Sequence, residues 1–212
     1  MGKHAFSLKT IYLAALTAVF AVSFFAFVAF DLYSQQKQTE QAMLEEARTF
    51  AREMDAVWQF MDNQQNVINY TSDGTYEFKG LHCSVVGKSI GKLFSAGSDY
   101  AIRYTNFNPR SEQDIPDEFE SEALGAFYAD RSVTEYYGVA DYQGEDRFRY
   151  LQALEVDNSC LECHGDPVGE LDITDHEKEG WTLDSVGGAI SIVIPLDQQQ
   201  GAMRDNVIRD VA

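Results

Sequence analysis

The stretch that decides the fold is a pair of strand-like segments joined by a short turn. TEYYGVADY (residues 134–142) and DRFRYLQALEV (residues 146–156) flank Gln143-Gly144-Glu145. Both segments contain aromatic and β-branched residues, and a glycine between two such runs is typical of a β-hairpin. A hairpin with expected helices before and after it in the chain predicts an α+β domain with a mostly antiparallel sheet.

Two more strands and three helices are expected around the hairpin. In chain order these are a short helix at 81–94, a strand at 100–107, a helix at 117–128, a strand at 187–196 and a terminal helix at 197–212 that leads out of the domain. Asn108-Pro109 ends the first of these strands, and Pro116 opens the helix that follows it. Gly87 and Gly91 weaken the prediction of the short helix, because glycine is a poor helix former. No internal repeat is visible.

The N-terminal region contains an apolar run long enough to cross a membrane. Thr10–Phe30 is 21 residues without a charge, which spans about 30 Å as a helix at about 1.5 Å per residue. Lys3 and Lys9 precede the run and acids predominate after it, so the positive-inside rule predicts a single-pass protein of the cell membrane with a cytoplasmic N-terminus. The alternative is a signal peptide cleaved at Ala21-Val22-Ser23, which would leave an apolar end.

These boundaries predict four parts. They are a cytoplasmic stub with its anchor at 1–33, a membrane-proximal helix at 34–68, the folded domain at 69–196 and the terminal helix at 197–212. The membrane-proximal helix carries an apolar stripe at alternating spacings of four and three: Met43, Ala47, Phe50, Met54, Val57 and Met61. Such a stripe either packs against the helix's own domain or forms a coiled-coil-like homodimer seam.

The segment Asn158–Gly165, NSCLECHG, contains two of the three cysteines and one of the four histidines in the chain. A redox-active Cys160-x-x-Cys163 would require a βαβ context, which is missing, and a zinc ribbon would require a second such pair. A disulfide across two residues is strained and leaves His164 without a role. The remaining interpretation is C-type haem attachment, in which two thiols bind the vinyl groups and the adjacent histidine binds the iron.

The second axial position of such an iron has several candidates. Cys83 could serve, although a free cysteine is often simply a buried apolar residue. The competing side chains are His82, His176, Met54, Met61 and Met203. His4 is expected on the other side of the membrane.

The order of these signals resembles the Tll0287-like family of haem-binding domains. The matching pieces are Cys83, Arg103, Asn108-Pro109-Arg110, Pro116-Asp117 with Glu120, the Cys160–His164 motif and the strand Gly187–Leu196. The resemblance implies a PAS-like fold carrying one covalent haem c per chain, with His164 and Cys83 as axial ligands. It departs at Ser111–Asp114, where the family more often has a second Asn and a Pro. Domains of this kind also occur as extracytoplasmic inputs of membrane sensor histidine kinases.

Two functions are consistent with these features. One is a sensor of redox state or a small gas that passes its signal through the membrane-proximal helix to an effector. The other is a membrane-tethered monohaem cytochrome that carries single electrons to a redox partner.

A net charge of −18 argues against a nucleic-acid partner. No hydrolase triad, Walker loop or dinucleotide motif is present, so a kinase core would lie beyond residue 212. The acid-rich segment 166–184 is expected to be a solvated loop, because its spacing fits no EF-hand.

Overall fold

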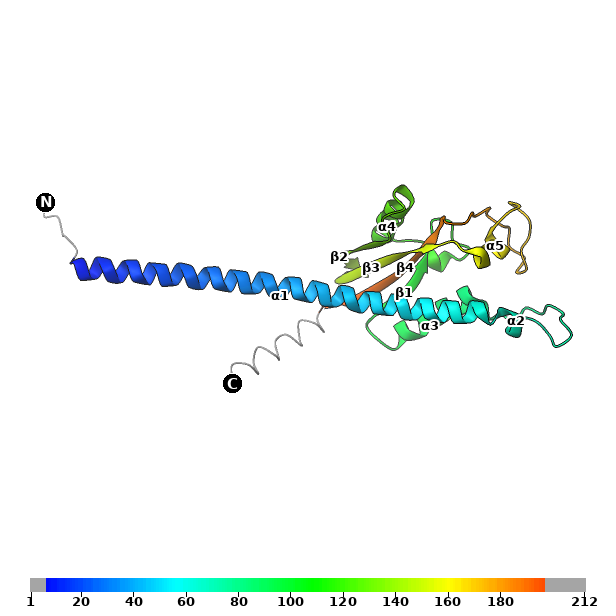
Figure 1. Ribbon diagram of the computed structural model, residues 1–212, viewed down its shortest axis with the longest axis horizontal. Coiled ribbons are helices and arrows are strands. Elements are labelled where there is room, and N and C mark those ends of the chain that lie inside the picture. Colours follow the sequence, from blue (N-terminus) through cyan, green and yellow to red (C-terminus); the bar gives the residue numbers. More distant parts are fainter. Residues whose placement is uncertain (1–6, 197–212) are drawn as a thin grey trace. The chain divides into compact units, whose positions relative to one another are not determined.

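The computed structural model describes residues 7–196, apart from the side chain of Cys83, and combines helices with one antiparallel sheet (Figure 1). This confirms the predicted α+β class. Contacts divide the chain into two compact units, Met1–Ala42 and Met43–Ala212. The expected terminal helix at 197–212, Met203 and His4 lie outside the described residues.

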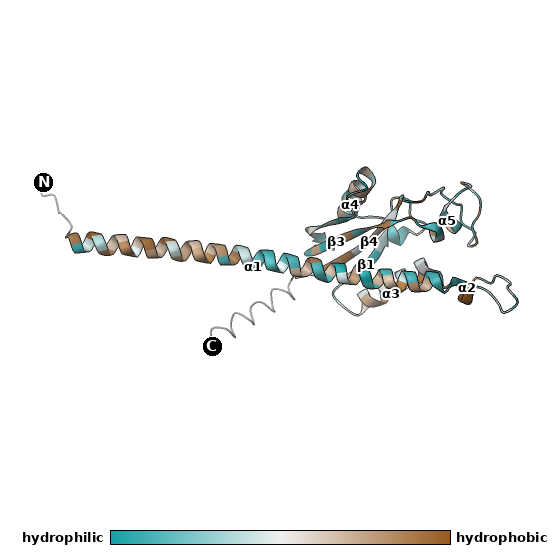
Figure 2. Cartoon of the chain, viewed as in Figure 1, coloured by the Kyte–Doolittle hydropathy of each residue, from teal (hydrophilic) through white to brown (hydrophobic). Residues whose placement is uncertain are grey.

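The first unit contains the start of helix α1, which as a whole runs from Leu8 to Asn63. Its N-terminal part includes the apolar run (Figure 2), with a mean hydropathy of 2.4 over 18 residues, none of them buried. Within residues 7–196, α1 is the one helix long and apolar enough to cross a membrane, and a signal sequence near the N-terminus would share these properties.

The sheet has four strands in the order β1-β4-β3-β2, all antiparallel. The strands are β1 (Ala101–Thr105), β2 (Glu135–Tyr142), β3 (Glu145–Glu155) and β4 (Val186–Pro195). The hairpin between β2 and β3 closes through Gln143 and Gly144, both with positive φ, which is the conformation of a tight two-residue hairpin turn. All four strands therefore lie where the sequence predicted them.

The helices of the second unit include the end of the helix expected at 34–68 and two shorter helices that were also expected. Up to residue 196 the helices of this unit are the end of α1, α2 (Gln65–Ile68), α3 (Cys83–Ala96), α4 (Glu118–Ala129) and α5 (Asn158–His164), with a short 3-10 turn at Glu112–Asp114. α3 and α4 match the helices expected at 81–94 and 117–128. α4 begins with a capping box in which Asp117 and Glu120 satisfy each other's backbone N–H groups.

The apolar stripe of α1 lies largely in the core of the second unit. Met43, Ala47 and Met54 are buried, and they share one hydrophobic cluster with Tyr150 of β3 and Ile192 of β4. Figure 1 shows this part of α1 beside the sheet. A dimer seam made from the same side chains would have to withdraw them from the core, which is costly. The homodimer therefore stays a prediction that would need other residues of α1.

The two glycines of α3 allow this helix to approach β1 closely. A Cβ added at Gly91 would lie 2.7 Å from the carbonyl oxygen of Ile102, and one added at Gly87 would lie 3.0 Å from the hydroxyl of Tyr104. These glycines weaken the helix locally, as the sequence suggested, but they are required by its packing.

This packing predicts that Gly91→Ala lowers the stability of the domain, although helix propensity alone would raise it. Gly91→Ala gains about 1 kcal/mol in propensity but forces a clash with backbone worth about 1–3 kcal/mol, so we expect net destabilisation. Gly125→Ala in α4 is the control, since no atom lies within 4 Å of its added Cβ, and it should stabilise by about 0.5–1 kcal/mol. Urea unfolding measures both. A more stable Gly91→Ala variant would contradict the close approach.

Candidate functional site

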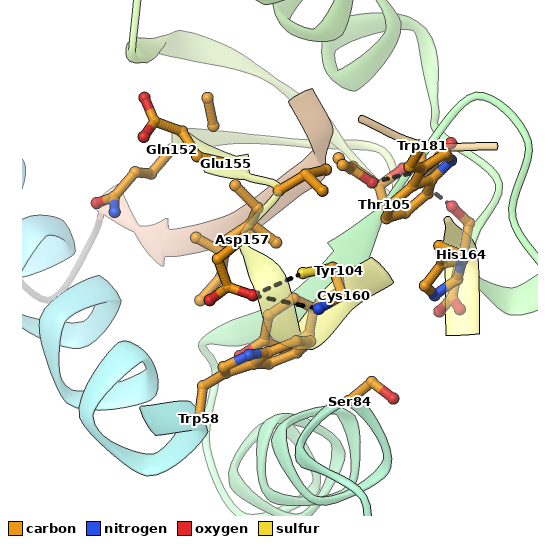
Figure 3. A pocket seen from close by; sticks show the side chains of 18 of the residues that line it. Trp58, Ser84, Tyr104, Thr105, Gln152, Glu155, Asp157, Cys160, His164 and Trp181 are labelled. Carbon is orange, nitrogen blue, oxygen red and sulfur yellow. Dashed lines mark hydrogen bonds between the residues drawn. The ribbon is translucent and has the colours of Figure 1, made fainter. Parts of the chain in front are cut away.

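A cavity of about 710 Å³ lies within the second unit and brings distant parts of the chain together. Its wall includes residues from α1, α3, β1, β3, α5 and β4, and the loops after β1 and α5. Trp58, Tyr104 and Trp181 supply aromatic surface (Figure 3). The volume falls within the roughly 300–1,000 Å³ that is usual for pockets binding a small molecule or cofactor.

Both cysteines of the CxxCH motif line this cavity from the short helix α5. Asp157 caps the helix by accepting hydrogen bonds from the backbone N–H groups of Ser159 and Cys160, at 2.9 and 3.2 Å. Residues three apart on a helix lie on the same side, so Cys160 and Cys163 both lie on the side of α5 that lines the cavity. The sequence reasoning did not assign a helix here, although Asp157 followed by Ser159 is a signal for a cap.

Cys160 and Cys163 are free thiols. Burial raises the pKa of each to about 11, since a thiolate would lose its solvation there. Redox-active CxxC pairs depend on a lowered thiol pKa. The environment of these two cysteines therefore disfavours the dithiol interpretation.

His164 is oriented by two contacts. Its ring stacks on Trp181, with centroids 4.0 Å apart and an interplanar angle of 11°. Its Nδ1 lies 2.7 Å from a carboxylate oxygen of Glu179. Because a carboxylate accepts hydrogen bonds, Nδ1 must donate, which leaves the lone pair on Nε2. Desolvation lowers the pKa of His164 despite the opposing effect of Glu179, which favours the neutral imidazole, the form that binds a metal.

Two acids expected in a solvated loop are instead part of the site. Asp172 has a fully buried side chain and pairs with Arg110, whose Nη1 lies 2.6 Å from its carboxylate. Glu179 is half-buried and also pairs with Arg110, at 2.7 Å. Burial alone would raise the pKa of both acids, but hydrogen bonds from Arg110, together with Thr174 for Asp172 and His164 for Glu179, lower it. The expectation of a solvated loop was wrong for these two residues, because Arg110, whose side chain is 23% exposed, supplies the counter-charge.

The candidates for a second iron ligand occupy different places. His82 is half-buried, lines the cavity and precedes α3 as its N-cap. Cys83 is the first residue of α3, and its side chain is outside the described part of the structure. His176 is exposed, and its Nδ1 contacts Thr174. Met54 is packed in the core. Of these described side chains, His82 is the one on the cavity wall.

The residues on the wall fit a haem better than a bare metal ion. Within residues 7–196, and leaving aside the Cys83 side chain, no three His, Cys, Asp or Glu side chains converge to hold a metal ion. A haem attached covalently would instead use two thiols and an imidazole beside a cavity with aromatic surface, and these are the groups present. Trp181 is part of that surface, whereas the rings of Tyr136 and Tyr137 pack against Phe119 and Phe148.

Sequence reasoning missed several residues of the site. Trp58 and Tyr104 face each other at 5.7 Å between ring centroids, and they reach the cavity from α1 and β1. Glu179 carried no local signal beyond its charge. Its importance follows from its contacts with Arg110 and His164, which lie 69 and 15 residues away in the sequence.

Comparisons with known proteins concern the family and the fold of this chain. The model of the Tll0287-like family matches residues 36–195, more than half of the chain. A solved structure, titled the crystal structure of the cyanobacterial heme-protein Tll0287, is similar with a TM-score of 0.55 at 19% sequence identity. The alignment covers 72% of this chain and 94% of that one, and at this identity it establishes a shared fold. No curated protein matches the sequence.

Proposed function

Because the chain belongs to the Tll0287-like family, we propose that it is a haem-binding sensor domain, with one haem c bound covalently through Cys160 and Cys163. The observation that carries this proposal is the grouping of both thiols and His164 on the wall of one large cavity. His164 would bind the iron through Nε2. Cys83, at the start of α3 between the cavity-lining residues His82 and Ser84, would be the second ligand. The bound haem would supply an iron that changes oxidation state and can bind a small gas.

Sensing is supported by the part that α1 plays in the cavity wall. Ala51, Asp55, Trp58 and Gln59 of α1 all line the cavity. A change of ligation or charge at the haem would therefore act directly on the helix that precedes the domain, which is the kind of coupling a switch requires. An electron carrier would use the same site without needing this link, so sensing of redox state or a gas is the function we propose.

We further propose a setting at the cell membrane. The apolar part of α1 would be the single span, with the N-terminus in the cytoplasm and the haem domain outside it, where haem c is attached. Lys3 and Lys9 before the apolar run and the acids after it support this orientation. An effector and a second copy of the chain would be the partners of a sensor in this position.

The proposal is tested by asking whether the haem is covalent. Full-length protein made in a host with haem c maturation should keep its haem through denaturation and acid-acetone extraction. The Cys160→Ala/Cys163→Ala variant should lose all covalent haem, because both thioether bonds are removed. Cys83→Ala is the matched control: it also removes a thiol, but it should keep the covalent haem. Extractable haem in the native chain, or covalent haem in the double variant, would contradict the proposal.

A further inference from the structure

Glu179 is the side chain that accepts a hydrogen bond from the proposed iron ligand, His164. Its Oε2 accepts a hydrogen bond from Nδ1 of His164 at 2.7 Å, and both side chains are about a quarter exposed. The rest of the ring is fixed by Trp181, which stacks on it and also donates from its backbone N–H to the carbonyl of His164 at 2.7 Å. The imidazole therefore has one defined tautomer and one defined plane.

Arg110 in turn fixes Glu179. Its guanidinium binds the two carboxylate oxygens from Nε and Nη2, at 2.7 and 2.9 Å. Its Nη1 binds the buried Asp172 at 2.6 Å, and Nη2 also donates to the carbonyl of Cys163 at 2.8 Å. A planar guanidinium suits a bidentate carboxylate in a way that the ammonium of lysine does not. Arg110 thus ties Glu179 to α5, the helix that contains the CxxCH motif.

A carboxylate hydrogen-bonded to the outer nitrogen of a ligating histidine makes that histidine a stronger donor. We propose that Glu179 and Arg110 are a positioning pair for His164, in which Glu179 strengthens its donation through Nε2 and Arg110 holds Glu179 in place. This inference rests on the proposed role of His164 as an iron ligand. Its consequence is a lower reduction potential than the same site would have without Glu179, because stronger donation favours ferric iron.

The test is a potentiometric titration of the full-length holoprotein and its variants. Glu179→Gln keeps the shape of the side chain but removes its charge, so the reduction potential should rise. Glu177→Gln is the matched control. It makes the same change of net charge at an exposed residue. Glu177 contacts Arg110 through its backbone carbonyl, which lies 3.4 Å from Nη2 and is unchanged by the substitution. Screening by water and salt should leave its potential close to that of the native protein.

Arg110→Lys separates geometry from charge, because it retains the cation but loses the bidentate contact. It should shift the potential in the native background and have little further effect in the Glu179→Gln background, since residues that act through one another are not additive. Equal shifts in both backgrounds would overturn the role of Arg110. Equal potentials for Glu179→Gln and Glu177→Gln would overturn the role of Glu179. If Glu179→Gln does not accumulate, Glu179→Asp, which shortens the side chain, decides in the same way.

Covalent haem content, measured before each titration, keeps this inference apart from the proposed function. A native protein without covalent haem would contradict the proposed function. Haem-loaded variants with the same reduction potential as the native protein would contradict the positioning pair alone.

Discussion

Replacing Cys83 with alanine is expected to convert the ferric protein from a thiolate-ligated low-spin form to a high-spin or histidine-ligated form and to raise its reduction potential. A thiolate donates strongly and stabilises ferric iron, so its loss favours the ferrous state. The position of Cys83 supports this role, because it begins α3 between His82 and Ser84, which both line the cavity.

Absorption and electron paramagnetic resonance spectra of the ferric holoprotein would measure this change. Ser84→Ala is the matched control, since it removes a cavity-lining polar group from the next residue and should leave the spectrum unaltered. His82→Ala distinguishes the competing ligand: if His82→Ala changes the ferric spectrum and Cys83→Ala does not, His82 holds the second axial position and the thiolate assignment is wrong.

The sheet could be predicted from sequence because its signals are local. The β2–β3 hairpin needs a turn at Gln143-Gly144 and two flanking strand-like runs, and all of this lies within 21 residues, 135–155. The apolar stripe of α1 was just as visible, yet the sequence did not decide whether it packs against its own domain or against a second copy of the chain. Periodicity shows that a helix face is buried but does not say against what. The cluster with Tyr150 and Ile192 answers this question with residues about 100 to 150 positions away.

The residues of the candidate site could be predicted where they lie close together in the sequence. Cys160, Cys163 and His164 form a motif that requires a particular spacing, and the structure places all three on one cavity wall. The contacts that orient them are long-range, as Arg110 shows by reaching Asp172, 62 residues away. Charge alone suggested a solvated loop there, because the acids of this segment give no sign of a counter-charge as distant in sequence as Arg110.

Another arginine, Arg149, is buried and supports the fold rather than the cavity. Arg149 of β3 has a side chain that is 1% exposed, and its Nη2 lies 2.7 Å from Asp117 and 3.5 Å from the fully buried Glu120. Its guanidinium also lies over the rings of Phe119 and Tyr142, at 4.9 and 5.3 Å. It thus joins β3 to the capped start of α4.

Arg149→Ala is therefore expected to be among the most destabilising single substitutions in the domain. Removing one partner of a buried ion pair leaves the other charge in a poorly solvated place, which costs about 3–5 kcal/mol. Arg103, whose Nε lies 3.4 Å from Glu120, would be the remaining counter-charge for that carboxylate. The lost cation–π contacts add to the effect.

Arg147→Ala is the matched control, on the same strand and with the same loss of charge. Its partner Glu145 is largely exposed, with 67% of the side chain accessible, and exposed ion pairs contribute less than about 1 kcal/mol. Urea unfolding of the two variants should therefore differ by about 2–4 kcal/mol in free energy. If the two unfold at the same urea concentration, the charges around Glu120 do not hold β3 to α4, and the apolar contacts of Ala123, Leu124 and Phe127 with the sheet must do so instead.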